Sequence, residues 1–341
     1  MPLPDGLLGG DGREGGGGYV LGVDGGATKT VAAVLRRADR RAFGALAGPS
    51  NPDAVGAEAA TAAVKTAIAE ALSAAEVDGG RVDAAVLALA GTSTDELRPE
   101  LAGAFGLRSV QLVNDVVGAW AAGTGGRPGI AAISGTGSHV FGVNERRETW
   151  KCGGWGHVLG DEGSGYWLGR RALRAALAYR DGSGPPTSVL QAALDEYGLE
   201  RIELLPDLVY GQPLSKSEIA AFTARVAAQA EAGDAVAVEL FEQAARDLAR
   251  QVGGVVRELG FGEAPFPVAM VGSVFRSGAV LVEPFARAVS ALAPRAELRL
   301  PHLPSIAGPL VLALLTEGAW QPADEAWLGE ALEAVRSSGV A

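Results

Sequence analysis

Residues 23–30 read VDGGATKT, and they directly follow a short apolar run. The stretch combines an acid, two glycines, two hydroxyls and a lysine, a composition that suits both a hairpin turn and a phosphate-binding loop. It is not a Walker A loop, because that motif needs Gly-Lys followed by Ser or Thr, and Gly-Lys occurs nowhere in the chain. Taken alone, the turn leaves both explanations open.

A second turn of the same kind, SGTGS at residues 134–138, follows another apolar run. Glycine allows close approach of a ligand, successive backbone N–H groups converge on an anion, and hydroxyls add donors. Two such turns, at the same place in two similar halves, favour phosphate binding over a pair of ordinary hairpins. We therefore predict phosphate contacts from Gly25, Gly26 and Thr28 in the first turn, and from Gly135, Thr136 and Gly137 in the second.

The hydrophobic pattern divides the chain into two α/β halves. The first half predicts a β-β-β-α-β-α-β-α order that opens with an antiparallel meander. Its strands are expected at 19–23, 30–35, 41–47, 82–89 and 109–113, and an alanine-rich helix is expected at 54–75. The pattern then restarts with strands at 129–134 and 139–143, after which helices dominate, including one expected at 216–232. Two related halves would leave a cleft between them, where small ligands usually bind.

Composition narrows the class of partner. The chain has 341 residues, 48% of them hydrophobic, which is enough for two packed domains. The formal charge of -11 argues against nucleic acid or an anionic membrane, since both are bound through clustered Lys and Arg. No segment is long and apolar enough to span a bilayer and no secretory leader is recognisable, so we expect a cytoplasmic protein.

Two acidic residues stand where predicted strands end. Asp24 closes the first strand, and a carboxylate beside phosphates suits a shared Mg²⁺, although such a residue can also merely cap its turn. Asp115 follows the strand at 109–113 and precedes a helix whose N-terminus would stabilise an ionised carboxylate. The structural alternative for Asp115 is a helix N-cap. Lys29 is left without a role.

Three further motifs follow the opening turn in a fixed order: ISGTGS at 133–138, GGWGHVLGDEGSGYW at 153–167 and VAMVGSVFRSG at 268–278. Together they resemble the N-acetylglucosamine kinase-like branch of the sugar kinase, actin and heat-shock chaperone superfamily, over about residues 19–318. The resemblance implies two ribonuclease-H-like (actin-like ATPase) domains that use ATP and Mg²⁺. It also implies transfer of phosphate to the 6-OH of N-acetylglucosamine or a close relative (glucosamine, N-acetylmannosamine or N-acetylmuramic acid).

The resemblance assigns roles to individual residues. Asp115 matches the general base, and Gly272 with Ser273 match the adenosine end of the nucleotide site. The metal-side role of Asp24 rests on its place beside the first turn. The matching sugar-side positions are Asn51, Gly91, Thr92, Asp115, Gly154, Trp155 and Asp161. Without the resemblance, Asn51 reads equally as a loop residue before proline and Gly272 as an ordinary turn glycine. His157, between Trp155 and Asp161, is more often structural than catalytic.

These assignments divide the chain into four segments. A Gly- and Pro-rich stretch at 1–18 predicts a flexible tail. Residues 19–117 form the expected N-terminal domain, with the sugar side and the first turn, and 118–305 the C-terminal domain, with the second turn and the adenosine site. Helices in 306–341 are expected to pack back on the N-terminal domain. The expected partner is a small amino sugar, and a homodimer is left open.

Three other functions stay under consideration. Activators of 2-hydroxyacyl-CoA dehydratases and benzoyl-CoA reductase share the superfamily, but they bridge a [4Fe–4S] cluster with two cysteines per subunit. This chain has the single cysteine Cys152, so two copies supply only two of the four ligands. An actin-like assembly protein is not excluded by the residues. A sugar-binding regulator without catalysis is disfavoured by Asp115 and by both turns.

Overall fold

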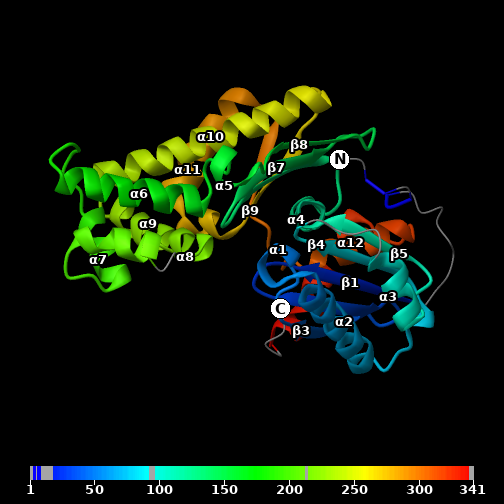
Figure 1. Ribbon diagram of the computed structural model, residues 1–341. Coiled ribbons are helices and arrows are strands. Elements are labelled where there is room, and N and C mark those ends of the chain that lie inside the picture. The colour runs from blue at the N-terminus through cyan, green and yellow to red at the C-terminus, as the bar shows by residue number, and fades with distance from the viewer. Residues whose placement is uncertain (1–2, 5, 9–17, 92–96, 212–213, 338–341) are drawn as a thin grey trace. The chain divides into compact units, whose positions relative to one another are not determined.

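The computed structural model describes residues 3–4, 6–8, 18–91, 97–211 and 214–337, which fall into two compact units (Figure 1). The first unit contains the described residues up to Ala131, Glu145–Thr149 and those from Arg299 onward. The second contains Ala132–Asn144 and Trp150–Leu298. The observed division therefore differs from the predicted boundary after residue 117, because the helix that begins at Asp115 packs within the first unit.

The first unit is built on a five-stranded sheet with the order β3-β2-β1-β4-β5. Its strands are β1 (Tyr19–Gly25), β2 (Thr30–Arg36), β3 (Arg41–Ala47), β4 (Val82–Leu89) and β5 (Val110–Asn114). The pairs β1–β2 and β2–β3 are antiparallel, which confirms the predicted meander, and β1–β4 and β4–β5 are parallel. The two central strands, β1 and β4, are apolar almost throughout, as strands buried on both faces are.

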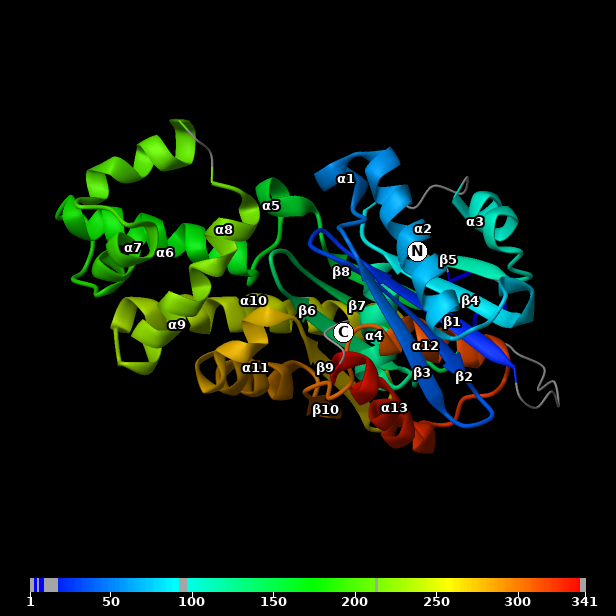
Figure 2. The same ribbon diagram turned by 90° about the horizontal axis from the view of Figure 1, so that it is seen from below.

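Helices cover both faces of this sheet (Figure 2). On one face, α2 (Ala57–Ala74) and α3 (Leu97–Phe105) pack over a core that includes Leu21, Val34 and Leu87. On the other face lie α4 (Asp115–Thr124) and α12 (Ala307–Thr316), and α13 (Glu325–Ser337) contacts β3. Gly22 allows α12 to approach β1, because a Cβ there would lie 2.9 Å from the Leu310 side chain. The remaining helices are α1 (Pro52–Val55), η1 (Gly79–Arg81) and η5 (Pro322–Asp324).

The second unit is built around a sheet with the order β10-β9-β6-β7-β8. Its strands are β6 (Gly129–Ser134), β7 (Ser138–Val143), β8 (Thr149–Gly153), β9 (Phe266–Val271) and β10 (Ala296–Arg299). The long helix α10 (Ala235–Leu259) packs on β7 and against α11 (Ala279–Leu292). Further helices are α5 (Gly156–Leu159), α6 (Gly165–Arg180), α7 (Val189–Tyr197), η2 (Ile202–Leu204), η3 (Asp207–Gly211), α8 (Lys216–Ala221), α9 (Thr223–Glu231) and η4 (Ser273–Ser277).

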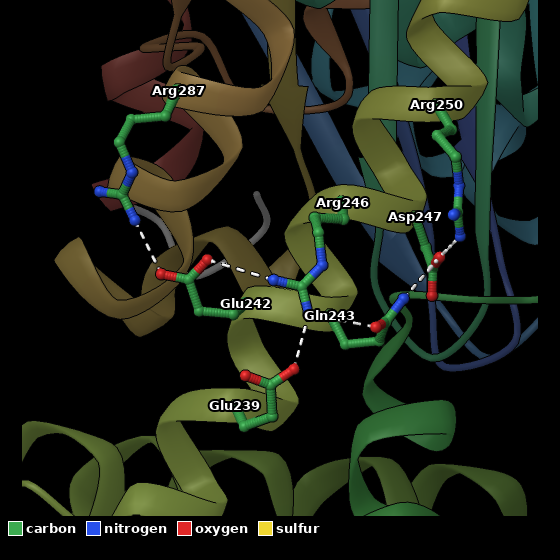
Figure 3. Close-up of polar contacts among 7 residues, drawn as sticks. All are labelled: Glu239, Glu242, Gln243, Arg246, Asp247, Arg250 and Arg287. Carbon is green, nitrogen blue, oxygen red and sulfur yellow. Dashed lines mark hydrogen bonds and ion pairs between the residues drawn. The ribbon is translucent and has the colours of Figure 1, made fainter.

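An ion-pair network lines α10 and ties it to α11 (Figure 3). The Arg246 guanidinium lies 2.6 Å from Glu239 and 3.6 Å from Glu242 along the same helix. The other oxygen of Glu242 lies 2.7 Å from Arg287 of α11. Networks of this kind are worth more than isolated surface pairs, so the Glu242–Arg287 contact helps hold α11 in register with α10.

Several predicted elements differ in detail from the structure. The helix expected at 54–75 is interrupted at Gly56, whose φ of 82° suits glycine and ends α1 before α2 begins. The helix expected at 216–232 is divided at Phe222 into α8 and α9. The predicted flexible tail is anchored at Leu7, which is buried and whose carbonyl accepts a hydrogen bond from Thr316. In the described part of the chain, no helix has the length and apolarity needed to cross a membrane.

Candidate active site

The first candidate site lies at one edge of the first unit's sheet. Strands β1, β4 and β5 are parallel, and their register places Gly25 opposite Leu89 and Leu89 opposite Asn114. Because the carboxyl ends of parallel strands meet at one edge, the residues that follow these strands gather there. The structure thus places the predicted residues Asp24, Gly91 and Asp115 along the same edge.

The turn after β1 is closed by its own backbone. The Gly26 N–H donates to the Lys29 carbonyl at 3.0 Å, and the Gly26 carbonyl accepts from Ser50 N and Asn51 N. Gly25 is required for packing, since a Cβ there would lie 2.3 Å from Ser50 Oγ. Thr28 is exposed at the tip of the turn. Packing at Gly25 and backbone hydrogen bonds at Gly26 therefore explain these two residues without a ligand. Thr28 is the predicted phosphate contact whose side chain faces solvent.

Asp24 is held by a residue far away in the sequence. Ser305, just before α12, donates its hydroxyl to Asp24 Oδ2 at 2.5 Å. Burial raises the pKa of Asp24 above its usual value, against the opposing effects of the Ser305 hydrogen bond and the Lys29 charge. No pattern in the sequence pointed to Ser305, and Lys29, which had no predicted role, lies close enough to act on the Asp24 charge.

The donor set around Asp24 suits a magnesium ion that is shared with a nucleotide. Among the described residues there is no group of three or more His, Cys, Asp or Glu side chains that could hold a metal by itself. Mg²⁺ commonly takes one or two carboxylates and completes its shell with phosphate oxygens and water. A single half-buried carboxylate beside the predicted phosphate turn fits that mode of binding.

Asp115 is the first residue of α4, but it does not supply the helix cap. The N-cap is Asn114, whose side-chain oxygen accepts a hydrogen bond from Val116 N at 3.3 Å. The structural alternative for Asp115 is therefore wrong, and Asn114 takes that role. As the first helical residue, Asp115 lies where the positive end of the α4 dipole stabilises negative charge.

Asn51 and Gly91 are in contact. Asn51 is the N-cap of α1, and its Oδ1 accepts from Asp53 N at 2.9 Å, which leaves the amide nitrogen as its other polar group. Gly91 has a φ of 87°, and a Cβ there would lie 2.9 Å from Asn51 Oδ1. The tertiary structure thus brings together two of the predicted sugar-side positions. Thr92, predicted beside them, lies outside the described residues.

The second candidate site centres on the turn between β6 and β7. The Gly135 N–H donates to the Gly137 carbonyl at 2.9 Å, and the carbonyls of Gly135 and Thr136 accept from Gly165 N and Tyr166 N of α6. Gly272 packs on this turn with a φ of 109°, since a Cβ there would lie 2.2 Å from the Ser134 carbonyl oxygen. The structure therefore joins the predicted phosphate turn to the predicted adenosine loop.

Asp161 lies under the same turn. Its side chain is buried, and its Oδ1 accepts from Ser138 N at 3.4 Å, beside the position where a Cβ on Gly137 would lie. Lys216 Nζ lies 3.6 Å from Asp161 Oδ2 and provides a nearby positive charge. Asp161 thus supports the phosphate turn, a role that was not expected for a residue assigned to the sugar. Sequence reasoning also missed Lys216, because α6, α7, η2 and η3 separate it from Asp161 along the chain.

Trp155 and Gly154 lie on the segment before α5. Gly154 donates its N–H to the Ser138 carbonyl at 3.1 Å, so this segment is tied to the end of the second turn. The Trp155 side chain is 71% exposed, which leaves its ring available to a ligand. His157 packs edge-on against Tyr166, with 5.2 Å between the ring centroids, which agrees with a structural role.

His139, two residues after Gly137, carries the most strongly perturbed imidazole of the site. Its Nε2 is shielded from solvent and has no hydrogen-bond partner among the described residues. Burial, reinforced by the Lys151 charge and opposed by Asp161, lowers the pKa of His139 to about 4. The ring is therefore neutral at physiological pH.

A pocket of about 400 Å³ opens beside the adenosine loop, within the second unit. It is formed by α8, α9 and η4 and is lined by Ala220, Ala221, Thr223, Ala224, Ala227, Ala228, Glu231, Ser273, Val274, Arg276 and Ser277. Its volume falls in the range of small-molecule sites. Ser273 is the predicted adenosine-site residue among them. The α9 residues were not predicted to line a site, because alanines at helical spacing ordinarily indicate a packed core.

The chain is similar to known amino-sugar kinases in sequence and in fold. An N-acetylmuramic acid/N-acetylglucosamine kinase from Clostridium acetobutylicum is 30% identical over 82% of this chain and 93% of its own length. An N-acetyl-D-glucosamine kinase from Dictyostelium discoideum is 27% identical over 82% of this chain and 92% of its own. A solved structure from Chromobacterium violaceum, a candidate N-acetylglucosamine kinase, superposes with a TM-score of 0.67 at 25% identity over 87% of this chain and 99% of that one.

The structural similarity confirms the predicted α/β fold with two actin-like ATPase domains, and the relatives support the predicted likeness to hexosamine kinases. Residues 21–308 match the BadF/BadG/BcrA/BcrD ATPase family, which covers both phosphate turns, the GGWGHVLGDEGS segment and the adenosine loop. The chain belongs to the BadF/BadG/BcrA/BcrD ATPase family.

Proposed function

We propose that this protein is a cytoplasmic, ATP-dependent kinase that phosphorylates the 6-OH of N-acetylglucosamine or a close relative. Two relatives, an N-acetylmuramic acid/N-acetylglucosamine kinase and an N-acetyl-D-glucosamine kinase, match this chain over 93% and 92% of their own lengths. The observation that carries the proposal is the position of Asp115. It stands at the N-terminus of α4, on the sheet edge that also holds the first phosphate turn.

In the proposed reaction Asp115 is the general base. Its carboxylate orients the 6-OH and accepts the hydroxyl proton while the bond between O6 and the γ-phosphorus forms. The bond between that phosphorus and the β,γ-bridging oxygen breaks, and ADP leaves. The α4 N-terminus stabilises the carboxylate before proton transfer, as expected for an acidic first helical residue.

Each turn is proposed to contact phosphate within its own unit. The donors proposed are the Thr28 hydroxyl in the first turn and Thr136 in the second, and the α6 amides hold the second turn in shape. Asp24 would hold Mg²⁺, which supplies charge neutralisation at the β- and γ-phosphates when bound. Ser305 keeps the Asp24 carboxylate in one orientation through its 2.5 Å hydrogen bond.

Sugar recognition is proposed for Asn51, Gly91, Thr92, Gly154, Trp155 and Asp161. The Asn51 amide nitrogen can donate to a hydroxyl while its oxygen caps α1. The exposed Trp155 ring offers a flat face for a pyranose. Asp161 can take this role only while it also supports the second turn, since its carboxylate lies against Ser138 N and Lys216.

The deciding experiment is a panel of hexoses and hexosamines with ATP and Mg²⁺, followed by ADP release and by detection of the sugar 6-phosphate. We expect turnover with N-acetylglucosamine or one of its three named relatives. We also expect Asp115→Asn to lower kcat by a factor of about 10² to 10⁴ while ATP binding is retained. ADP release that does not depend on any sugar, or full turnover by the Asp115→Asn variant, would contradict the proposal.

A further inference from the structure

We propose that Glu231 makes this site selective for adenine, by accepting a hydrogen bond from the exocyclic amino group of the base. The inference rests on the proposed use of ATP and assigns one residue of the pocket to nucleotide choice. It comes from the arrangement of groups along the pocket formed by α8, α9 and η4.

The inner end of the pocket adjoins the second phosphate turn. Thr223, the first residue of α9, donates its hydroxyl to the Gly165 carbonyl at 2.9 Å, and Gly165 N donates to the Gly135 carbonyl at 2.8 Å. On the opposite wall, Gly272 packs on the Ser134 carbonyl directly before Ser273. Phosphates bound at this turn therefore lie at the Thr223 end of the pocket.

Glu231 marks the outer end. It is the last residue of α9, eight positions after Thr223, so the helix rise places it about 12 Å farther along the axis. Its Oε1 lies 4.0 Å from the position of a Cβ on Gly278, the N-cap of α11. A nucleotide with its phosphates at the inner end places its ribose next and the far edge of its base near Glu231.

Between these two ends, Ala224, Ala227 and Ala228 of α9 contribute methyl groups, which suit the face of a planar base but cannot read its edge. Ala220 and Ala221 of α8 line the pocket beside its Thr223 end. Thr223 has its hydroxyl committed to Gly165. Ser273 and Ser277 belong to η4, across from this alanine wall. Along α9, therefore, Glu231 is the residue positioned to read the base edge.

A carboxylate can only accept hydrogen bonds. Adenine presents an amino donor at N6, whereas hypoxanthine and guanine present a carbonyl oxygen at the equivalent position. Facing Glu231, the adenine amino group gains a charge-assisted hydrogen bond and a carbonyl is repelled. A hydrogen bond to a charged group of this kind corresponds to discrimination of about 10-fold or more.

Arg276 lines the same pocket, but unlike Glu231 it is not expected to distinguish one base from another. No ion pair joins Glu231 to Arg276 in the described part of the chain, so neither charge neutralises the other directly. A planar guanidinium stacks on the face of a base and does not depend on the substituents at its edge. The outer end of the pocket is also braced, because α11, which begins beside Glu231, is tied to α10 by the Glu242–Arg287 pair (Figure 3).

The test compares ATP with inosine triphosphate, which carries a carbonyl in place of the amino group. Dissociation constants come from calorimetry, and kcat/KM values are measured with the best sugar of the panel. We expect the wild-type protein to prefer ATP over inosine triphosphate by about 10-fold or more.

The Glu231→Gln substitution should bring the ratio of the two affinities close to 1, because an amide can also donate a hydrogen bond to the carbonyl of hypoxanthine. Arg276→Ala should weaken both nucleotides equally, and Glu263→Gln, whose side chain is 96% exposed, should change nothing.

An unchanged ratio in the Glu231→Gln variant would overturn the assignment, as would equal wild-type affinity for the two nucleotides. A preference for guanosine triphosphate over ATP, with the carboxylate accepting from guanine N1 and N2, would also overturn it. The binding arm needs no acceptor sugar. If both nucleotides bind with the expected ratio but no sugar is phosphorylated, the proposed kinase activity fails and the role of Glu231 stands.

Discussion

Replacing His139 by glutamine should remove a defined part of the protein's acid sensitivity. His139 Nε2 is buried without a partner among the described residues, and burial lowers the pKa of the ring from 6.5 to about 4. The unfolded chain therefore binds a proton at a higher pH than the folded protein does. Stability from this group is complete above pH 6.5, and it is lost as the pH falls toward 4.

The size of the effect follows from the two pKa values. A difference of about 2.5 units corresponds to at most about 3.4 kcal/mol once the pH is below 4. At pH 5 the same linkage gives about 2 kcal/mol. The ring as a whole is half-buried, so partial access of water makes these values upper limits.

The assay is urea denaturation at pH 7 and pH 5, followed by tryptophan fluorescence, with the transition of the second unit fitted separately from that of the first. The wild-type protein should lose up to about 2 kcal/mol more than His139→Gln between these pH values. His302→Gln is the matched control for the replacement of a histidine by glutamine, because its side chain is 62% exposed. Equal losses in the wild-type and His139→Gln proteins would refute the burial argument.

Three further substitutions test the site. Gly272→Ala should raise the KM for ATP by about 10-fold, because the new Cβ would lie 2.2 Å from the Ser134 carbonyl oxygen. Gly262→Ala is the control and should leave steady-state kinetics unchanged, because no atom lies within 4 Å of its Cβ position. Asn114→Ala should cost about 1 kcal/mol in urea denaturation through loss of the α4 cap, and Asn114→Asp should not. Lys216→Met should destabilise the second unit by about 1–3 kcal/mol, because buried Asp161 loses its nearby cation. Lys216→Arg, which keeps the positive charge, should be as stable as the wild-type protein. An unchanged melting curve for Lys216→Met would contradict this reasoning.

The expectation for Asp115 shows where local sequence reasoning succeeded. A strand followed by Asn-Asp and an apolar helix was sufficient to place an acid at the carboxyl edge of a sheet. The sequence did not decide which of the two residues, Asn114 or Asp115, caps α4. Both Asn and Asp are good N-caps, and the structure shows that Asn114 makes the capping hydrogen bond.

Asp161 lies beyond what a local stretch of sequence determines. The GGWGHVLGDEGS segment implies a sugar contact for Asp161. Its φ of 62°, its burial and its contacts with Ser138 N and Lys216 depend on how α8 and the second turn pack around it. None of these contacts leaves a periodic or local pattern in the sequence.

The strands, most helices and the two turns follow from short stretches of sequence, because hydrophobic periodicity, glycine and hydroxyl side chains act on the backbone within a few residues. Contacts between distant residues depend instead on the folded chain. In this way Ser305 contacts Asp24, Gly91 lies against Asn51, Gly272 packs on Ser134 and Lys216 lies beside Asp161. The tertiary structure also decided that an alanine face of α9 lines a pocket that ends at Glu231. Such contacts depend on strand register and on how helices pack, and no short stretch of chain encodes either one.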